Sequence, residues 1–151
     1  MAVVADTGPL YALADADDEF HSIVKTWAGK NKEAIIVPGS VVVEVCYLVL
    51  EHLGPAAEIA FLQSLANREM LLEQPTAKDL ERSIQILKQY RDSQFGMVDA
   101  TVMAMAERLN VQTVLTLDHR HFSIYRPQHV NLFTLVPCVV SRRGWPRKNR
   151  R

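Results

Sequence analysis

Cysteine is scarce in this sequence, which contains only Cys46 and Cys138, each within an apolar stretch. Two cysteines are too few for a disulfide scaffold, and a free thiol in such a stretch usually behaves as a small buried hydrophobe. A chain that does not rely on disulfides is suited to a reducing compartment, so we expect a cytoplasmic protein.

Long hydrophobic runs are missing as well. No apolar stretch approaches the roughly 20 residues that a membrane-spanning helix needs. The first residues also lack the basic-then-apolar order of a signal peptide. We therefore expect a protein that neither spans a membrane nor is exported.

Net charge is absent too, because 17 Lys and Arg residues balance 17 Asp and Glu residues. The balance hides an uneven distribution, since the last eleven residues contain six cations and no acid, which leaves 11 cations against 17 acids in the rest. We expect residues 1–140 to form one folded domain and residues 141–151 to form a basic C-terminal tail.

The basic tail can bind a polyanion by neutralising phosphate charge, with Trp145 stacking on a base. The residues predicted to contribute are Arg142, Arg143, Trp145, Arg147 and Lys148. The alternative is a disordered end that keeps the protein in solution, because Gly144 and Pro146 interrupt any regular element. The sequence leaves both interpretations open.

What the sequence does contain is an alternation of short apolar runs and amphipathic stretches, over a length that suits one domain. The runs predict strands at Ala2–Ala5, Ala34–Val37, Met70–Glu73, Thr113–Leu117 and Asn131–Leu135. Helices are predicted between them, one with Ser40 as its N-cap and one starting at a capping box formed by Thr76 and Asp79. Continuously apolar strands favour a three-layer α/β fold, in which helices flank a mostly parallel sheet of four to five strands.

Two acids directly follow predicted strands. Asp6 comes after AVVA, and Asp118 comes after TVLTL. Ligands of open parallel sheets bind outside the carboxyl ends of the strands, so both side chains are predicted to emerge at the same edge. The alternative for each residue is a plain helix N-cap, a position that Asp favours.

Two further acids interrupt apolar helices. Glu44 lies within VVVEVCYLVL and is therefore expected to avoid water, whereas Asp99 shares a helical face with Met103 and Ala106. An ionised carboxylate in such surroundings is costly unless a cation compensates it. Buried ion pairs with Lys or Arg are one possibility, although most cations lie in polar stretches such as KNKE and LKQYRD.

A bound metal ion is the stronger candidate for the compensating charge. Four carboxylates form a hard, all-oxygen ligand set that suits Mg²⁺ or Mn²⁺ better than Zn²⁺. Such an ion can activate a water molecule and neutralise the charge of a phosphodiester. His119 and His121 lack further convincing ligands, and we interpret both as loop residues.

Four segments together resemble the PIN domain, and more narrowly the VapC-type toxins of bacterial toxin–antitoxin pairs. They are VVADTGPLYAL, PGSVVVEVCYLVL, FGMVDATVMAMAERL and TVLTLDHRHF, which extend from Val3 to Phe122. The resemblance implies that the core acidic ligands are Asp6, Glu44 and Asp99, with Asp118 as the fourth acid. It also implies supporting hydroxyl groups at Thr7 and Thr116.

The resemblance further implies an Mg²⁺-dependent or Mn²⁺-dependent endoribonuclease that forms a homodimer and is silenced by an antitoxin protein. The basic tail does not map onto the family pattern, and in this context RNA would be its polyanion. One alternative is a phosphohydrolase with Asp6 as nucleophile, but that class needs a second Asp at the position of Gly8. Another alternative is a catalytically silent PIN-like module that binds RNA or a protein.

Overall fold

The computed structural model describes residues 1–139 of the chain. The predicted RNA-binding residues of the tail, Arg142, Arg143, Trp145, Arg147 and Lys148, lie outside the described residues. The proposed boundary between a folded domain and a basic tail therefore stays a prediction.

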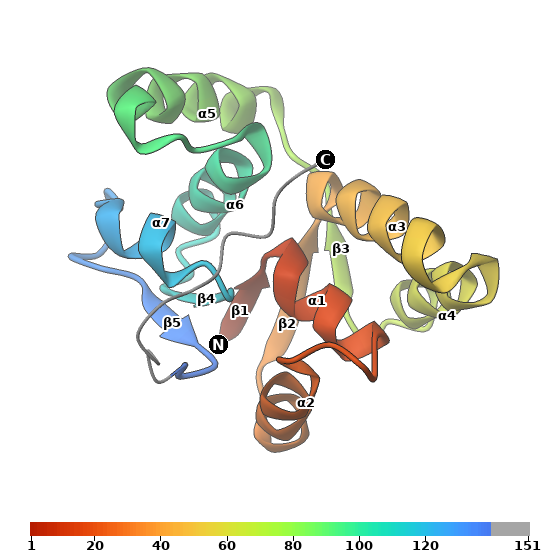
Figure 1. Cartoon of the computed structure of the whole chain (residues 1–151). Helices are drawn as coiled ribbons and strands as arrows, with labels where there is room; N and C mark the ends of the chain where they lie inside the picture. The colour runs from red at the N-terminus through yellow and green to blue at the C-terminus, as the bar shows by residue number, and fades with distance from the viewer. Residues whose placement is uncertain (140–151) are drawn as a thin grey trace.

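A five-stranded parallel sheet forms the centre of the molecule, in the order β3-β2-β1-β4-β5 (Figure 1). The strands are β1 (Ala2–Ala5), β2 (Ala34–Pro38), β3 (Leu71–Glu73), β4 (Thr113–Leu115) and β5 (Thr134–Val136). The central strand β1 pairs with β2 on one side and with β4 on the other, and Val3 and Val4 are fully buried. Burial on both faces explains why this strand is continuously apolar.

Within residues 1–139, seven helices flank the sheet, which confirms the predicted three-layer α/β fold. They are α1 (Thr7–Ala14), α2 (His21–Lys30), α3 (Gly39–Leu53), α4 (Pro55–Ala66), α5 (Ala77–Gln89), α6 (Met97–Arg108) and α7 (His119–Ile124), with a short 3-10 helix at Arg91–Ser93. Within residues 1–139, none of these helices has both the length and the apolar character needed to cross a bilayer.

Helix α6 is buried over most of its length. Every residue from Ala100 to Ala106 is buried, including Met103 and Met105, which have no exposed surface. A helix that is apolar on all sides belongs inside a protein rather than on its surface. Asp99 precedes this segment directly, so its carboxylate lies where the core meets the edge of the sheet.

Of the two helix-capping predictions, one is confirmed and the other is wrong. The capping box of α5 is confirmed, because Thr76 and Asp79 exchange hydrogen bonds between side chain and backbone. The prediction of Ser40 as an N-cap is wrong, since α3 begins at Gly39 with Pro38 as its N-cap. The Ser40 hydroxyl is instead buried and has no hydrogen-bond partner among the described residues.

Candidate metal centre

Asp6 and Asp118 both lie at the carboxyl edge of the sheet. Strands β1 and β4 pair in register up to Ala5 and Leu115, and the Asp6 N–H donates a 2.8 Å hydrogen bond to the Leu115 carbonyl. Asp6 is the first residue after β1, whereas Asp118 is the third residue after β4. The parallel pairing brings two acids together that are more than a hundred residues apart in the sequence.

The Asp6 carboxylate is buried, with 7% of the residue exposed, and it does not cap its helix. Asp6 stands at the N-cap position of α1 without a side-chain capping bond. Its carboxylate accepts a 2.9 Å hydrogen bond from the Thr116 hydroxyl instead. The simple N-cap interpretation therefore does not explain this acid.

The pKa of Asp6 is raised from 3.8 to about 7. Burial is the largest cause, followed by the negative charge of Asp99, and Asp118 adds a smaller effect of the same sign. Hydrogen bonds from the Thr7 backbone and the Thr116 hydroxyl act in the opposite direction. A carboxylate in this position is stabilised by any cation that enters the cluster.

Thr116 joins two of the acids. Its hydroxyl donates to Asp6 and accepts a 3.0 Å hydrogen bond from the Asp118 N–H, and the residue is completely buried. The Thr7 hydroxyl is also buried but has no hydrogen-bond partner among residues 1–139. Buried polar groups are normally hydrogen-bonded, so the Thr7 hydroxyl remains free to bond to a ligand or a water molecule.

Asp118 has two contacts with the same histidine. One carboxylate oxygen accepts the His121 N–H at 3.1 Å, which caps α7, and the other lies 2.9 Å from Nδ1 of the His121 ring. The N-cap alternative for Asp118 is thus true, although capping uses only one of its two oxygens.

Asp99 occupies the first turn of α6, and 21% of its side chain is exposed. One of its oxygens accepts a 3.2 Å hydrogen bond from the Gly96 N–H and lies 3.5 Å from His121 Nδ1. The pKa of Asp99 is raised, mainly by burial, with smaller contributions from the charges of Asp118 and Glu44. The Gly96 hydrogen bond and the His121 charge lower it in part.

Glu44 corrects one expectation, because it is exposed to solvent rather than hidden from it. The core face of α3 consists of Val41, Val45 and Val49, spaced by four residues, and Glu44 lies off that face. Its apolar sequence neighbours are on the surface too: the exposed fractions are Val43 71%, Tyr47 67% and Leu50 46%. Glu44 nevertheless raises the pKa of Asp99, so it stands at the rim of the acidic cluster.

His121 was missed by the sequence analysis. The interpretation of His119 and His121 as loop residues is wrong, because both belong to α7. Ligand atoms of Asp99, Asp118 and His121 all lie within 4.8 Å of one another, a grouping that can hold a metal ion. The available signal was the spacing of three residues between a helix-capping Asp and a His, which brings both side chains to one helix end.

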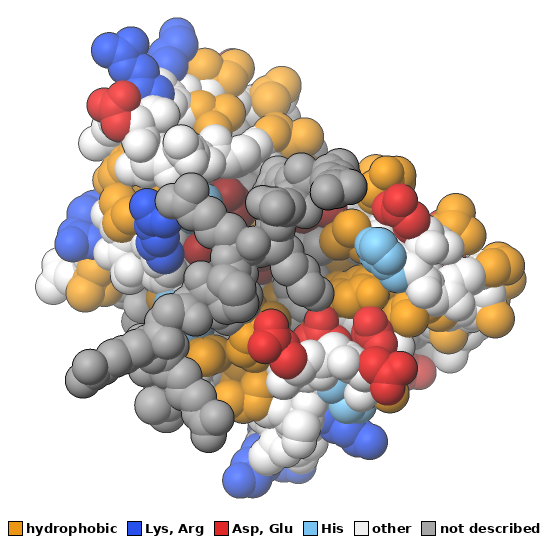
Figure 2. Space-filling model, viewed as in Figure 1, with side chains coloured by type: hydrophobic (Ala, Val, Ile, Leu, Met, Phe, Trp, Pro, Cys, Tyr) orange, Lys and Arg blue, Asp and Glu red, His pale blue; other side chains and the backbone are white. Residues whose placement is uncertain are grey.

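Among the described residues, no lysine or arginine forms an ion pair with these acids. Within residues 1–139, the ion pairs of arginine join Arg82 to Glu107, and Arg108 to Glu73 and Asp79. The candidate acids pair, in that part of the chain, with His121 alone. Figure 2 shows the blue side chains of described Lys and Arg residues mostly toward the edge of this face, and several red acidic side chains nearer its middle.

The donor set fits a divalent cation. Carboxylate oxygens are the ligands that Mg²⁺ and Mn²⁺ prefer, and an entering cation would offset the repulsion that raises the pKa of both Asp6 and Asp99. The buried Thr7 hydroxyl and the buried His121 Nδ1 are further polar atoms, and neither forms a hydrogen bond with a described residue. Within residues 1–139, no Lys or Arg provides the buried ion pair that the sequence left open as an alternative.

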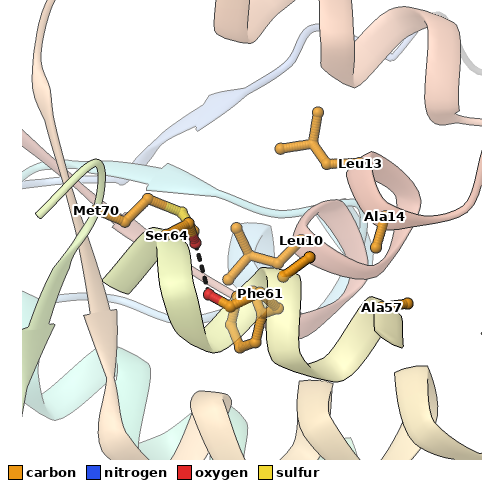
Figure 3. Close-up of a pocket in the computed structure, with 8 residues that line it drawn as sticks. Leu10, Leu13, Ala14, Ala57, Phe61, Ser64 and Met70 are labelled. Atoms are coloured by element: carbon orange, nitrogen blue, oxygen red, sulfur yellow. Dashed lines mark hydrogen bonds between the residues drawn. The ribbon is translucent and has the colours of Figure 1, made fainter. Parts of the chain in front are cut away.

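A hollow of a different character lies between α1 and α4 (Figure 3). It measures about 230 Å³ and is lined mainly by apolar side chains, among them Leu10, Leu13 and Phe61. Its polar contributor, Ser64, donates its hydroxyl to the Phe61 carbonyl at 2.6 Å. A lining without a titratable side chain provides no acid, base or metal ligand, so we assign the chemistry to the acidic cluster.

Comparison with known proteins identifies related chains. The PIN domain family matches residues 3–127. The chain is 36% identical over 135 residues to Ribonuclease VapC26 of Mycobacterium tuberculosis, which covers 89% of this chain and all of that protein.

Solved structures give a similar picture at the level of the fold. VapC20 of Mycobacterium tuberculosis, a toxin that cleaves the sarcin–ricin loop, has a TM-score of 0.71 at 22% identity, covering 74% of this chain and 86% of that one. A toxin–antitoxin complex from Klebsiella pneumoniae has a TM-score of 0.64 at 16% identity, covering 80% and 90%. At these identities the likeness concerns the fold alone.

Proposed function

The chain belongs to the PIN domain family, and from this premise we propose that it is a metal-dependent endoribonuclease, the toxin of a type II toxin–antitoxin pair. The observation that carries the proposal is the cluster of Asp6, Asp99 and Asp118 at the edge of the sheet. Burial and mutual repulsion raise the pKa of Asp6 to about 7, and no described Lys or Arg pairs with these acids. The similarity to a named ribonuclease over that protein's whole length supports the same reaction class.

In the proposed site, Asp6, Asp99 and Asp118 hold Mg²⁺ or Mn²⁺, with Glu44 contributing from the rim. When bound, such an ion activates a water molecule for attack on phosphorus and neutralises charge on the phosphate. Thr116 keeps the Asp6 carboxylate in place through its 2.9 Å hydrogen bond. The Thr7 hydroxyl is available beside it for a ligand or a water molecule.

The protein's own charges make RNA binding depend on the ion. Without a cation, three carboxylates repel a phosphodiester, because like charges in a partly buried site are weakly screened. We assign additional RNA affinity to the tail residues Arg142, Arg143, Trp145, Arg147 and Lys148, which lie outside the described part of the chain.

The proposed partners are an antitoxin protein and a second copy of the chain, in the cytoplasm. Antitoxin binding follows from the proposed role as a toxin and would keep the nuclease silent. Exposed apolar side chains offer area for protein contacts: Val43 and Tyr47 on α3, and Ile59 and Leu62 on α4, which are 64% and 43% exposed.

Cleavage of defined RNAs by the purified full-length chain tests the proposal. We expect cleavage with Mn²⁺ or Mg²⁺, loss of cleavage with EDTA, and recovery when the metal ion is restored. Co-expression with the cognate antitoxin should yield a complex with suppressed cleavage. A protein that retains RNA but does not cleave it with either ion would be a silent binding module, and the nuclease proposal would be wrong.

A further inference from the structure

We propose that His121 is a nitrogen ligand of the metal ion held by Asp99 and Asp118, and that this ligand makes the site favour Mn²⁺ over Mg²⁺. The inference rests on the proposed function and specifies the ion. An all-carboxylate site, by contrast, predicts oxygen ligands alone.

The position of the imidazole nitrogen carries the proposal. Nδ1 of His121 lies 2.9 Å from one oxygen of Asp118 and 3.5 Å from one oxygen of Asp99. The nitrogen is buried, and in spite of these short distances it forms no hydrogen bond of acceptable direction with any described residue. Neighbouring ligands about 2.1 Å from an octahedral ion lie about 3 Å apart. The 2.9 Å separation from the Asp118 oxygen matches that value, and the 3.5 Å separation from the Asp99 oxygen is longer.

The ring is also held in place before any ion binds. The His121 backbone N–H donates to Asp118, so the helix start fixes the residue relative to that carboxylate. The ring packs edge-on against Phe95, with ring centres 5.3 Å apart, and Phe95 is 8% exposed. A preorganised side chain loses little conformational freedom when it binds a ligand, so the nitrogen is available at low cost.

Nitrogen coordination alters the choice of ion. Mg²⁺ is a hard ion that prefers oxygen ligands and gives up its water reluctantly. Among the divalent transition metals Mn²⁺ has the lowest affinity for nitrogen-containing sites, but as a transition metal it accepts an imidazole ligand more readily than Mg²⁺ does. The His121 ring therefore adds affinity for Mn²⁺ and little for Mg²⁺.

The test compares the full-length chain with the His121→Asn variant. Pulsed electron paramagnetic resonance on the Mn²⁺-loaded protein detects hyperfine coupling to a directly bound nitrogen, independently of any cleavage assay. Calorimetry then gives the dissociation constants of Mn²⁺ and Mg²⁺. His52→Asn is the matched control, because it makes the same change in an imidazole that is 55% exposed and 4.0 Å from a single carboxylate, Glu51.

We expect nitrogen coupling in the parent and in His52→Asn, and its loss in His121→Asn. The Mn²⁺ dissociation constant should rise at least about tenfold in His121→Asn, whereas that of Mg²⁺ should change less than about twofold. A parent protein that binds Mn²⁺ without nitrogen coupling would overturn the proposal even if His121→Asn failed to fold. Equal losses for both ions would also overturn it, because they indicate that His121 only orients Asp118.

Failure of the His121 proposal can be distinguished from failure of the proposed function. Mn²⁺-dependent RNA cleavage without nitrogen coupling removes His121 from the ligand set and leaves the nuclease proposal intact. Nitrogen coupling without cleavage keeps the metal site, including His121, but argues against the nuclease. Failure to bind either ion contradicts both.

Discussion

The Thr116 hydroxyl donates a 2.9 Å hydrogen bond to the Asp6 carboxylate, across 110 positions of the sequence. The same oxygen accepts the Asp118 N–H at 3.0 Å. One buried side chain thus ties the acid after β1 to the loop that carries the acid after β4. The parallel pairing of these two strands is what places Thr116 within reach of Asp6.

Replacing Thr116 by valine tests this connection. Val keeps the shape of Thr but has no hydroxyl, so the Asp6 carboxylate loses a donor and the Asp118 N–H loses an acceptor, at a cost of about 1–3 kcal/mol. We expect weaker Mn²⁺ binding and RNA cleavage reduced at least about tenfold, measured by calorimetry and by single-turnover kinetics. Thr116→Ser restores the hydroxyl and should recover most of both. Equal cleavage by the valine variant would remove Thr116 from the site.

The raised pKa of Asp6 predicts a pH dependence of stability in the metal-free protein. Because the folded pKa of about 7 lies above the ordinary value of 3.8, the folded state binds a proton more strongly than the unfolded state. The resulting stabilisation is complete below about pH 4 and is lost as the pH rises through about 7. In EDTA, the free energy of unfolding should therefore fall between pH 5 and pH 8.

Asp6→Asn isolates this contribution, because it removes the titrating group and keeps an oxygen that can accept the Thr116 hydrogen bond. Each unit of pKa shift corresponds to about 1.4 kcal/mol. At pH 8 in EDTA, the free energy of unfolding of the variant should therefore exceed that of the parent by about 2–4 kcal/mol. Urea unfolding at pH 5 and pH 8 measures the difference. Asp17→Asn, at an exposed acid, is the control and should follow the parent. If Asp6→Asn keeps the parent's full pH dependence, Asp6 is not the titrating group.

Asp99→Asn separates catalysis from folding. The Asn oxygen can still accept the Gly96 N–H, so the start of α6 is preserved. The charge is lost, and we expect RNA cleavage to fall at least about a hundredfold while the thermal unfolding midpoint in EDTA stays equal or rises. Asp92→Asn, at an exposed acid in the 3-10 helix, should cleave like the parent. Cleavage by Asp99→Asn at the parent rate would contradict the metal-site proposal.

Asp79 has a basic partner, so its substitution should lower stability and leave metal binding unchanged, the opposite of what we expect for Asp99→Asn. The Asp79 side chain is 3% exposed, accepts both from Arg108 Nε and from the Thr76 backbone, and lies outside the acidic cluster. Asp79→Asn removes the buried one of the two carboxylates that pair with Arg108 and leaves Glu73 as the other, and we expect a loss of about 1–3 kcal/mol in the free energy of unfolding, measured in urea. The Mn²⁺ dissociation constant should stay unchanged. Greater stability in this variant would show that the pair is not stabilising.

The fold was predictable because its main signals are local. Short apolar runs produced strands, and the Thr76–Asp79 box produced a helix start, since neither depends on distant contacts. Strand ends were less accurate: β4 stops at Leu115 rather than Leu117.

The site was predictable only in part, because side-chain exposure depends on tertiary packing. Glu44 was expected to be buried on account of its apolar neighbours, but α3 has more apolar residues than its core face accommodates. His121 was dismissed because its partners are not all close in sequence: Asp118 is three residues away, but Asp99 is in another helix. A search for ligands along the sequence alone does not detect such a grouping.

The basic tail gives the last prediction. If its six cations bind RNA, deletion of residues 142–151 should weaken binding and flatten the dependence of log affinity on log salt, by up to about 0.7 for each cation removed. Fluorescence anisotropy between about 50 and 200 mM salt measures the slope, in an Asp99→Asn background that prevents cleavage. Trp145→Ala is the companion variant, and it should reduce affinity without altering the slope, because stacking on a base does not release counterions. If the deletion leaves the slope unchanged, the tail does not contact the RNA backbone, and a role in solubility is the remaining interpretation.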